Sequence, residues 1–264
     1  MRWAFKLAYI GHRFHGFQRQ PDQQTVEGDI LEVLLSKEII DDPRQSGFQS
    51  ASRTDRNVSA LGNVSAFDSP VDGRKIVATL NASLTDIWFY AYTRVSSRFS
   101  PRKAEERWYR YDFPGELPIE ELEDIAGLFE GRHDFRIFCK GRRTGVCDVR
   151  EVRLTRLGDR TILDIRADRF LWNMVRRVAG CLQMVANGEL EQHEVEGALG
   201  GKPISIRLVP PEYLWLMDVS YAFPFQPFPT IKVREAILKS MEEKRNQVRF
   251  LSELLQRMGE PRRS

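Results

Sequence analysis

The sequence ASRTDRNVSALGNVSAF, residues 51–67, sets one acidic residue inside a basic tetrapeptide directly before a run of small and apolar residues. Such a run is typical of a strand in a sheet. Asp55 lies between Arg53 and Arg56 at the start of that run. A strand does not require the sequence Arg-Thr-Asp-Arg at its beginning. The stretch therefore predicts a strand preceded by a functional loop.

Three roles are open to Asp55 from the residues alone. It can be an ordinary turn residue, satisfied by backbone amides or by a neighbouring arginine. It can be a metal ligand, which would need further carboxylates that the sequence does not reveal nearby. It can be a nucleophile, because flanking guanidinium groups would lower the pKa of the carboxyl group and fix its orientation. The same arginines would also bind the phosphates of a nucleic acid.

The first half of the chain alternates apolar runs with helical periodicity. Thr25 has the residue type of a helix N-cap, and the Asp-Asp-Pro sequence at 41–43 is a helix stop. The predicted elements are a strand at 3–10, a helix from Thr25 toward 41–43, the strand after Asp55, a helix near 72–83 and a buried strand at 86–95.

The second half repeats this alternation. Pro118 and Gly131 have the residue types that begin and end a helix. Two alternating runs on either side of Gly158-Asp159 predict a hairpin. The predicted elements are a strand at 106–113, a helix from Pro118 to Gly131, hairpin strands at 151–157 and 161–167, a helix with an apolar face from Phe170 to Val185 that ends at Asn187-Gly188, and a last strand at 213–221.

Strands adjacent in sequence and mixed with helices predict an α+β fold with antiparallel pairing, rather than a doubly wound parallel sheet. A polar, proline-containing stretch near 100–107 suggests a boundary between domains at 1–104 and 105–225. Residues 226–264 follow as a third segment, with a long helix predicted at 231–258. This segment carries nine Lys and Arg residues against five Asp and Glu, whereas the first 225 residues carry 31 against 32. The C-terminal extension is therefore basic and the body neutral.

Several classes of protein are disfavoured by the composition. The three cysteines form no CxxC pair and the four histidines form no HExxH pair, so we expect free thiols in a reducing cytosol and no metal site. No Gly-rich phosphate loop occurs, and we expect no cofactor. No apolar run approaches the roughly 18 residues of a membrane helix. The sequence thus predicts a cytoplasmic globular protein.

The sequence resembles the TruA-type tRNA pseudouridine synthase family, with an archaeal character. The family's R-T-D motif is matched by the stretch around Asp55, and four other motifs occur in family order. These are YIGHRFHGFQRQPDQQTVEGDI at 9–30, RWYRYDF at 107–113, FEGRHDFRIFCK at 129–140 and FLWNMVRRVAGCLQMVANG at 170–188.

Three positions depart from the family pattern. Asn57 replaces a glycine, and asparagine is the non-glycine residue that best tolerates the left-handed conformation there. Ser59 replaces a frequent histidine, which argues against a chemical requirement for that histidine. Tyr213 stands where glycine is common, so the wall of the pocket is expected to differ there.

The resemblance implies two ferredoxin/RRM-like halves that share an extended antiparallel sheet, with a central basic cleft. It implies Asp55 as nucleophile, Tyr109 as the aromatic residue stacked on the target uracil and Arg176 as the partner of Asp55. It implies a tRNA substrate and a homodimer, without metal or cofactor. The further substrate-binding residues expected are Arg53, Phe170, Leu171, Arg142, Arg143 and Arg177.

The chemistry implied is the conversion of uridine to pseudouridine by an isomerase. The N-glycosidic bond breaks, and the uracil, flipped out of its stack, is reattached through C5. Asp55 could add to C6 of the uracil or act at C1′ of the ribose, and either Asp55 or Tyr109 could take the C5 proton. Bacterial members of the family act in the anticodon arm, at roughly positions 38–40, whereas other relatives in the superfamily use other tRNA sites. A non-catalytic RNA-binding protein on the same frame and a nucleosidase remain as alternatives, and the helix at 231–258 could serve dimerisation, packing or RNA binding.

Overall fold

The computed structural model describes residues 1–141, 145–229 and 231–258. The chain forms two compact units, Met1–Pro227 and Phe228–Ser264. The boundary predicted near residue 104 falls inside the first unit. The second unit contains the helix α6, Ile231–Met258, which spans the range predicted for it.

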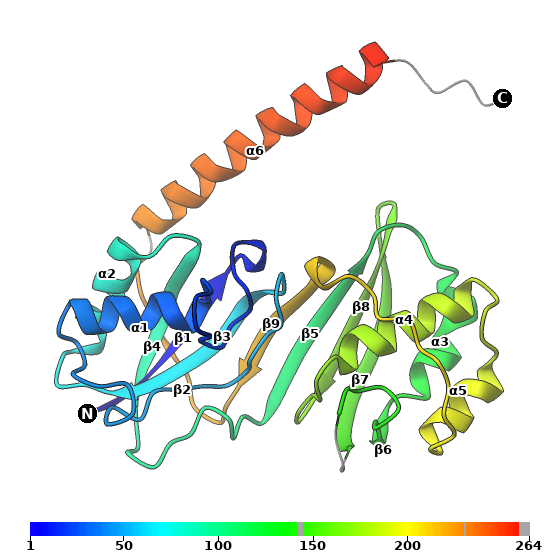
Figure 1. Cartoon of the computed structure of the whole chain (residues 1–264), viewed down its shortest axis with the longest axis horizontal. Helices are drawn as coiled ribbons and strands as arrows, with labels where there is room; N and C mark the ends of the chain where they lie inside the picture. Colours follow the sequence, from blue (N-terminus) through cyan, green and yellow to red (C-terminus); the bar gives the residue numbers. More distant parts are fainter. Residues whose placement is uncertain (142–144, 230, 259–264) are drawn as a thin grey trace. The chain divides into compact units, whose positions relative to one another are not determined.

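The first unit is built on a ten-stranded sheet with helices packed against it (Figure 1). Its strands are β1 Arg2–Tyr9, β2 Gln49–Ser50, β3 Ser59–Asp68, β4 Ile87–Val95, β5 Glu106–Phe113, β6 Gly131–Asp134, β7 Val146–Leu157, β8 Arg160–Ala167, β9 Leu214–Ser220 and β10 Gln226–Pro227. Its helices are α1 Val26–Ser36, α2 Gly73–Ser83, α3 Ile119–Gly127, α4 Met174–Ala186 and α5 Gln192–Leu199, with 3-10 turns at Gly11–Arg13 and Pro211–Tyr213.

The strand order is β10-β4-β1-β3-β9-β5-β8-β7-β6, with β2 paired to β3. Each of these pairings is antiparallel except that of β3 with β9, which is parallel and joins Ser59 to Trp215 and Ala60 to Leu216. The mixed α+β class and the dominant antiparallel pairing are therefore confirmed. The parallel junction between β3 and β9 was not predicted.

The two sides of this junction repeat one arrangement. On the first side, β1, β2, β3 and β4 lie in the order β4-β1-β3-β2, with α1 between β1 and β2 and α2 between β3 and β4. On the second side, β5, β7, β8 and β9 lie in the order β9-β5-β8-β7, with α3 between β5 and β7 and α4 between β8 and β9. Both sides thus place their fourth strand beside their first and their third beside their second.

The alternation of β1 explains the core of the first side. Phe5, Leu7 and Tyr9 are fully or almost fully buried, and the ring of Phe5 stacks on Phe67 with centroids 5.0 Å apart. A strand with one apolar face buries it against helices on that side. Here, α1 begins as predicted, because the Thr25 side chain accepts a hydrogen bond from the Gly28 amide.

Some predicted boundaries were wrong. Helix α1 ends at Ser36 rather than near 41–43, because Glu38 takes a left-handed conformation (φ 53°) that a continuing helix does not allow. Helix α3 ends at Gly127 rather than at Gly131, and Gly131 instead begins β6. Phe170 lies before α4 and not on it.

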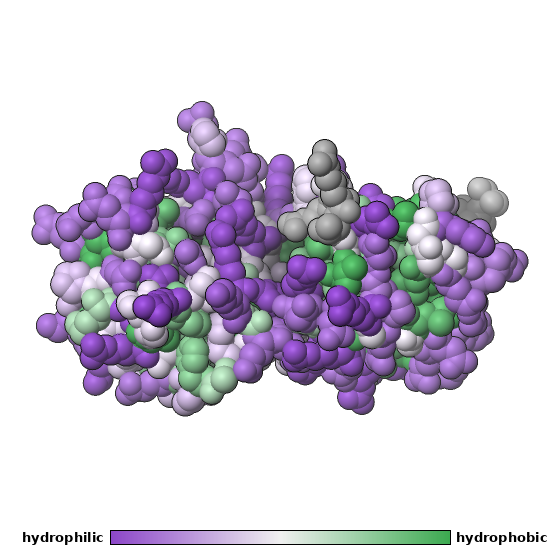
Figure 2. All heavy atoms as spheres, turned by 90° about the horizontal axis from the view of Figure 1, so that it is seen from below, coloured by the Kyte–Doolittle hydropathy of each residue, from purple (hydrophilic) through white to green (hydrophobic). Residues whose placement is uncertain are grey.

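The surface seen from below is mostly hydrophilic, with apolar side chains in separate patches (Figure 2). Within the described part of the chain, no helix combines the length and apolar character needed to cross a bilayer. Several apolar side chains of α6 are nevertheless exposed, among them Met241, Val248 and Leu251.

Candidate active site

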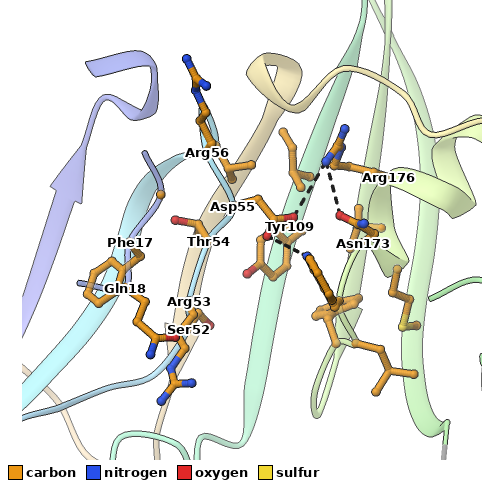
Figure 3. A pocket seen from close by; sticks show the side chains of 18 of the residues that line it. Phe17, Gln18, Ser52, Arg53, Thr54, Asp55, Arg56, Tyr109, Asn173 and Arg176 are labelled. Atoms are coloured by element: carbon orange, nitrogen blue, oxygen red, sulfur yellow. Dashed lines mark hydrogen bonds and ion pairs between the residues drawn. The ribbon is translucent and has the colours of Figure 1, made fainter. Parts of the chain in front are cut away.

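A cleft of about 800 Å³ opens in the first unit where its two sides meet. Segments 15–20 and 50–58 line it from the first side, and residues 169–176 line it from the second (Figure 3). Tyr109 of β5 and Leu214 at the start of β9 also contribute to its lining. The site is therefore assembled by connections between elements on a rigid sheet, which is where functional residues concentrate.

Charge is distributed unequally in this cleft. Among the described residues that line it, Asp55 is the single carboxylate. Seven cationic side chains line the cleft with it: Arg53, Arg56, Arg102, Arg107, Lys140, Arg169 and Arg176. A concave surface lined mainly by one sign of charge attracts ligands of the opposite charge. The cleft is thus suited to a polyanion, and Asp55 is its exception.

Two groups from the second side hold the carboxylate of Asp55. The indole Nε1 of Trp172 donates a hydrogen bond of 3.1 Å to Oδ1, and Nη1 of Arg176 lies 3.9 Å from Oδ2 (Figure 3). The Asp55 side chain is 33% exposed. The carboxylate is therefore oriented on both oxygens and is still accessible from the cleft.

The expected effect of the flanking arginines on Asp55 was wrong. Burial raises the pKa of the Asp55 carboxyl group above its ordinary value, and this exceeds the opposing effects of Arg176 and the Trp172 hydrogen bond. In Figure 3, Arg53 and Arg56 extend away from the carboxylate in different directions. The sequence neighbours of Asp55 thus face other parts of the cleft, and its guanidinium partner comes from α4.

A buried polar network fixes the loop that carries Asp55. The Asn63 amide donates to the Ser52 carbonyl (3.0 Å) and to the Tyr9 hydroxyl (3.3 Å), and its oxygen accepts from the Ser52 amide (3.3 Å). The Tyr9 hydroxyl is 2.7 Å from Oγ1 of Thr54. Ser52 and Thr54, on either side of Arg53, are thereby hydrogen-bonded to Asn63 of β3 and Tyr9 of β1.

The turn after Asp55 has the conformation expected from its sequence. Asn57 has φ 69°, in the left-handed region, and the Val58 amide donates to the Asp55 carbonyl at 3.2 Å. Ser59 accepts a hydrogen bond from the Gly11 amide at 3.0 Å. The replacement of glycine by asparagine therefore preserves the turn, as predicted.

Arg176 is held firmly at the start of α4. Its Nε donates to the Val209 carbonyl (2.8 Å) and its Nη1 to the Asn173 side chain (3.3 Å), and 12% of the side chain is exposed. Burial lowers the pKa of this guanidinium, and Asp55 opposes that shift. A guanidinium this deeply buried needs polar partners, and Val209, Asn173 and Asp55 supply them.

Tyr109 forms an aromatic wall of the cleft. The ring is 9% exposed and meets Phe170 edge to face, with centroids 5.0 Å apart and an interplanar angle of 82°. Burial raises the pKa of Tyr109 to about 12, so the phenol is protonated near neutral pH. Leu171 completes this wall beside Phe170.

The structure brings most of the predicted site residues together. Asp55, Tyr109, Arg176, Arg53, Phe170 and Leu171 line the cleft, whereas Arg177 is outside its lining and its Nη1 approaches the Ile137 carbonyl at 3.5 Å. Arg142 and Arg143 lie outside the described residues. Sequence reasoning missed Trp172 and the Tyr9–Thr54–Asn63 network. The only signal for Trp172 was a large aromatic residue inside the motif FLWNMVRR.

The fold and the cleft are those of a protein suited to bind a polyanion beside one oriented carboxylate. A family model described as tRNA pseudouridine synthase matches residues 125–222. The "tRNA pseudouridine synthase A" of Pyrococcus abyssi is 42% identical over 84% of this chain and 85% of its own length. The protein of the same name from Pyrococcus horikoshii is 39% identical over 92% of this chain and 95% of its own length. That of Methanothermobacter thermautotrophicus is 41% identical over 83% of this chain and 80% of its own length.

The chain belongs to the tRNA pseudouridine synthase A family, the TruA family of isomerases that convert uridine to pseudouridine in tRNA. The resemblance seen in five sequence motifs is thereby confirmed.

Proposed function

We propose that this chain isomerises a uridine in the anticodon arm of tRNA, at roughly positions 38–40, with Asp55 as the nucleophile. The observation that carries the proposal is the lone, accessible carboxylate of Asp55 in a cation-lined cleft, oriented by Trp172 and Arg176. The negatively charged backbone of tRNA suits the cations, and a flipped nucleotide suits the cleft volume of about 800 Å³.

The reaction requires an ionised nucleophile. Asp55 adds either to C6 of the uracil or to C1′ of the ribose, and the N1–C1′ bond breaks. The uracil turns, a C5–C1′ bond forms, the carboxylate is released, and the C5 proton is lost while N1 gains one. Arg176 stabilises the carboxylate in its ionised form. The proton balance closes without oxidant, reductant or nucleoside triphosphate.

The aromatic wall contacts the flipped base in this proposal. Tyr109, supported edge to face by Phe170, presents its ring toward a base that has left its stack. A pKa of about 12 for Tyr109 favours this contact over a role as the base that takes the C5 proton. Arg53, on the same loop as Asp55, binds a phosphate beside the flipped nucleotide.

The two sides of the sheet are ferredoxin/RRM-like halves in our interpretation, covering residues 1–104 and 105–225. Two features support this interpretation. Both halves share the spatial order of fourth, first, third and second strand, and each half has a helix after its first and its third strand. The extension from 226 remains a separate segment.

We further propose a cytoplasmic homodimer with tRNA as its partner. The exposed apolar side chains of α6, such as Met241, Val248 and Leu251, support packing of this helix against another surface. Light scattering of the full chain, with and without tRNA, tests the dimer directly.

The decisive experiment compares wild type with Asp55→Asn on tRNA that carries tritium at uracil C5. Wild type should release tritium without free uracil, whereas Asp55→Asn should release none and bind tRNA as before. Asp41→Asn, an exposed acid outside the cleft, is the matched control. Tritium release by Asp55→Asn at the wild-type rate would refute the nucleophile. Free uracil would indicate a nucleosidase, and retention of label by both proteins a non-catalytic RNA-binding protein.

The target uridine can be identified independently. Mapping pseudouridine in tRNA from a strain that lacks this protein should show losses confined to the anticodon arm. Losses at other tRNA sites would refute the proposed position while leaving the chemistry intact.

A further inference from the structure

We propose that Trp172 is a positioning residue for the reaction, whose indole N–H holds Oδ1 of Asp55 in the orientation needed for attack. This inference rests on the proposed role of Asp55 as nucleophile. It adds a second anchor to the arginine partner that the sequence motifs imply, and it assigns that anchor to a side chain of the segment between β8 and α4.

The two anchors of Asp55 come from one short segment. Trp172 contacts Oδ1 at 3.1 Å, within hydrogen-bond distance, whereas Arg176 lies 3.9 Å from Oδ2, beyond a good hydrogen bond. Trp172 is therefore the group that fixes the direction of the carboxylate, and Arg176 contributes charge. Between them, Asn173 has φ 66° and turns the chain into α4.

Trp172 is itself held in place although it is poorly buried. The residue is 50% exposed, so packing does not explain its position. The ammonium of Lys140 lies 4.7 Å from the centroid of its ring, and the Lys140 amide donates to the Trp172 carbonyl at 3.1 Å. A cation over an indole and a backbone hydrogen bond together restrict the ring. The donor is thus preorganised before substrate binds.

Loss of the indole N–H has a predictable effect on pH dependence. A hydrogen bond to the ionised carboxylate favours that form, so its removal raises the pKa of Asp55 further. Since attack needs the carboxylate, the rate of the variant should begin to fall at a higher pH than the rate of wild type. The other titratable and charged groups that line the cleft are unchanged in this variant, namely Arg53 and Arg56 on the same loop, His15, Tyr109 of β5, Lys140, Arg169 and Arg176.

The test is the single-turnover rate of tritium release by Trp172→Phe as a function of pH, with saturating enzyme. Phenylalanine keeps an aromatic ring and removes the donor. We expect a rate about 10- to 100-fold lower, because the loss of a hydrogen bond to a charged group corresponds to a change of that size. We also expect the acid limb of the pH–rate profile, where the rate falls as pH is lowered, to be displaced to higher pH. The Kd for tRNA should stay within about threefold of wild type, because the ring remains.

Trp108→Phe is the matched control. Trp108 also donates from Nε1 to a carboxylate, Oδ1 of Asp164 at 2.6 Å, but it lies outside the cleft lining. Its acid limb should coincide with that of wild type.

The alternative role for Trp172 is stacking on an RNA base. In that case Trp172→Ala would weaken tRNA binding strongly, while Trp172→Phe would show the wild-type rate and an unmoved acid limb. That result would overturn the inference. Asp55→Asn measured beside it separates the two proposals. If Asp55→Asn is inactive and Trp172→Phe is normal, only the positioning role fails, whereas an active Asp55→Asn would refute the nucleophile.

Discussion

The two halves of the sheet share one strand order but differ in which connections are long. In the first half, the connection from β2 to β3 spans residues 51–58 and carries Asp55, whereas the equivalent connection from β7 to β8 is the two-residue turn at 158–159. In the second half, the connection from β8 to α4 spans residues 168–173 and carries Phe170, Leu171 and Trp172. The equivalent connection of the first half, residues 69–72, does not line the cleft.

This difference shows how one repeated frame can build a single asymmetric site. The first half supplies the carboxylate on a loop anchored by buried hydrogen bonds to Tyr9 and Asn63. The second half supplies the aromatic wall of the cleft. It also supplies the guanidinium of Arg176, which lies beside that carboxylate. Asp55 and Trp172 therefore lie in connections between elements, whereas Tyr109 and Arg176 lie on β5 and α4.

After Asp55→Asn, which should abolish the reaction, the largest effect should follow from removing the charge that the second half contributes. Arg176→Gln should lower the single-turnover rate by about 10²-fold, because a preorganised charged group in a partly buried site contributes about that much. Its neighbour Arg177→Gln is the control, since Arg177 is outside the cleft lining, and its rate should stay close to that of wild type. Equal losses in the two variants would mean that α4 acts only through its folding.

A smaller effect should follow from loosening the anchor of the first half. Tyr9→Phe leaves Thr54 and Asn63 without one buried partner, so the free energy of unfolding should fall by about 1–3 kcal/mol. The rate per folded molecule should also fall several-fold with little change in Kd for tRNA. Urea unfolding and single-turnover assays measure the two quantities.

Tyr221→Phe separates anchoring from stability in that experiment. The Tyr221 hydroxyl donates to the Pro101 carbonyl at 2.6 Å, and neither residue lines the cleft. Its loss should destabilise the protein but leave the rate per folded molecule unchanged. If Tyr9→Phe showed this same pattern, the buried network would have no specific influence on Asp55.

A modest effect is expected at the rim of the cleft. Arg53→Gln should weaken tRNA binding by a few-fold, and the slope of log K against log salt should fall by about 0.7–0.9, as expected for one lost phosphate contact. Arg74→Gln, an exposed arginine on α2 outside the cleft, should leave the slope unaltered. A salt slope for Arg53→Gln equal to that of wild type would exclude a phosphate contact.

The smallest effect concerns stability. Because burial raises the pKa of Asp55 in the folded state, the folded state binds the proton more tightly than the unfolded state does. The Asp55 contribution therefore becomes less favourable as pH rises through that raised pKa. Asp55→Asn should then have a Tm at neutral pH equal to or slightly above that of wild type. A clear fall in Tm would mean that Asp55 stabilises the fold.

Much of the fold could be predicted from local patterns. The strand at 106–113 and the hairpin around Gly158-Asp159 have strong period-two patterns and clear turn residues, and both formed as predicted. Short elements such as β2 and β10 have two residues each and carry no periodic signal. The parallel pairing of β3 with β9 joins segments more than 150 residues apart, which no local pattern can indicate.

Several residues that line the cleft, and the pairing of Arg176 with Asp55, were predictable from the sequence, but the second contact of Asp55 was not. Asp55, Tyr109 and Arg176 were identified through the motifs that contain them. The partner of Asp55 Oδ1 was not, because Trp172 reaches it from 117 positions away along the chain. The predicted direction of the Asp55 pKa shift was also wrong, because burial raises that pKa in the folded cleft and the tetrapeptide gives no sign of how deeply Asp55 is buried.

The central claim is that both halves of one chain complete each active site. If the proposed dimer forms, co-expression of Asp55→Asn with Arg176→Gln on differently tagged chains, followed by purification of mixed dimers, tests this claim most directly. If one chain supplies both residues, the mixed dimers should release tritium no faster than Arg176→Gln alone. Recovery to about half of the wild-type rate, the value for one restored site in each two-fold symmetric pair, would contradict the account.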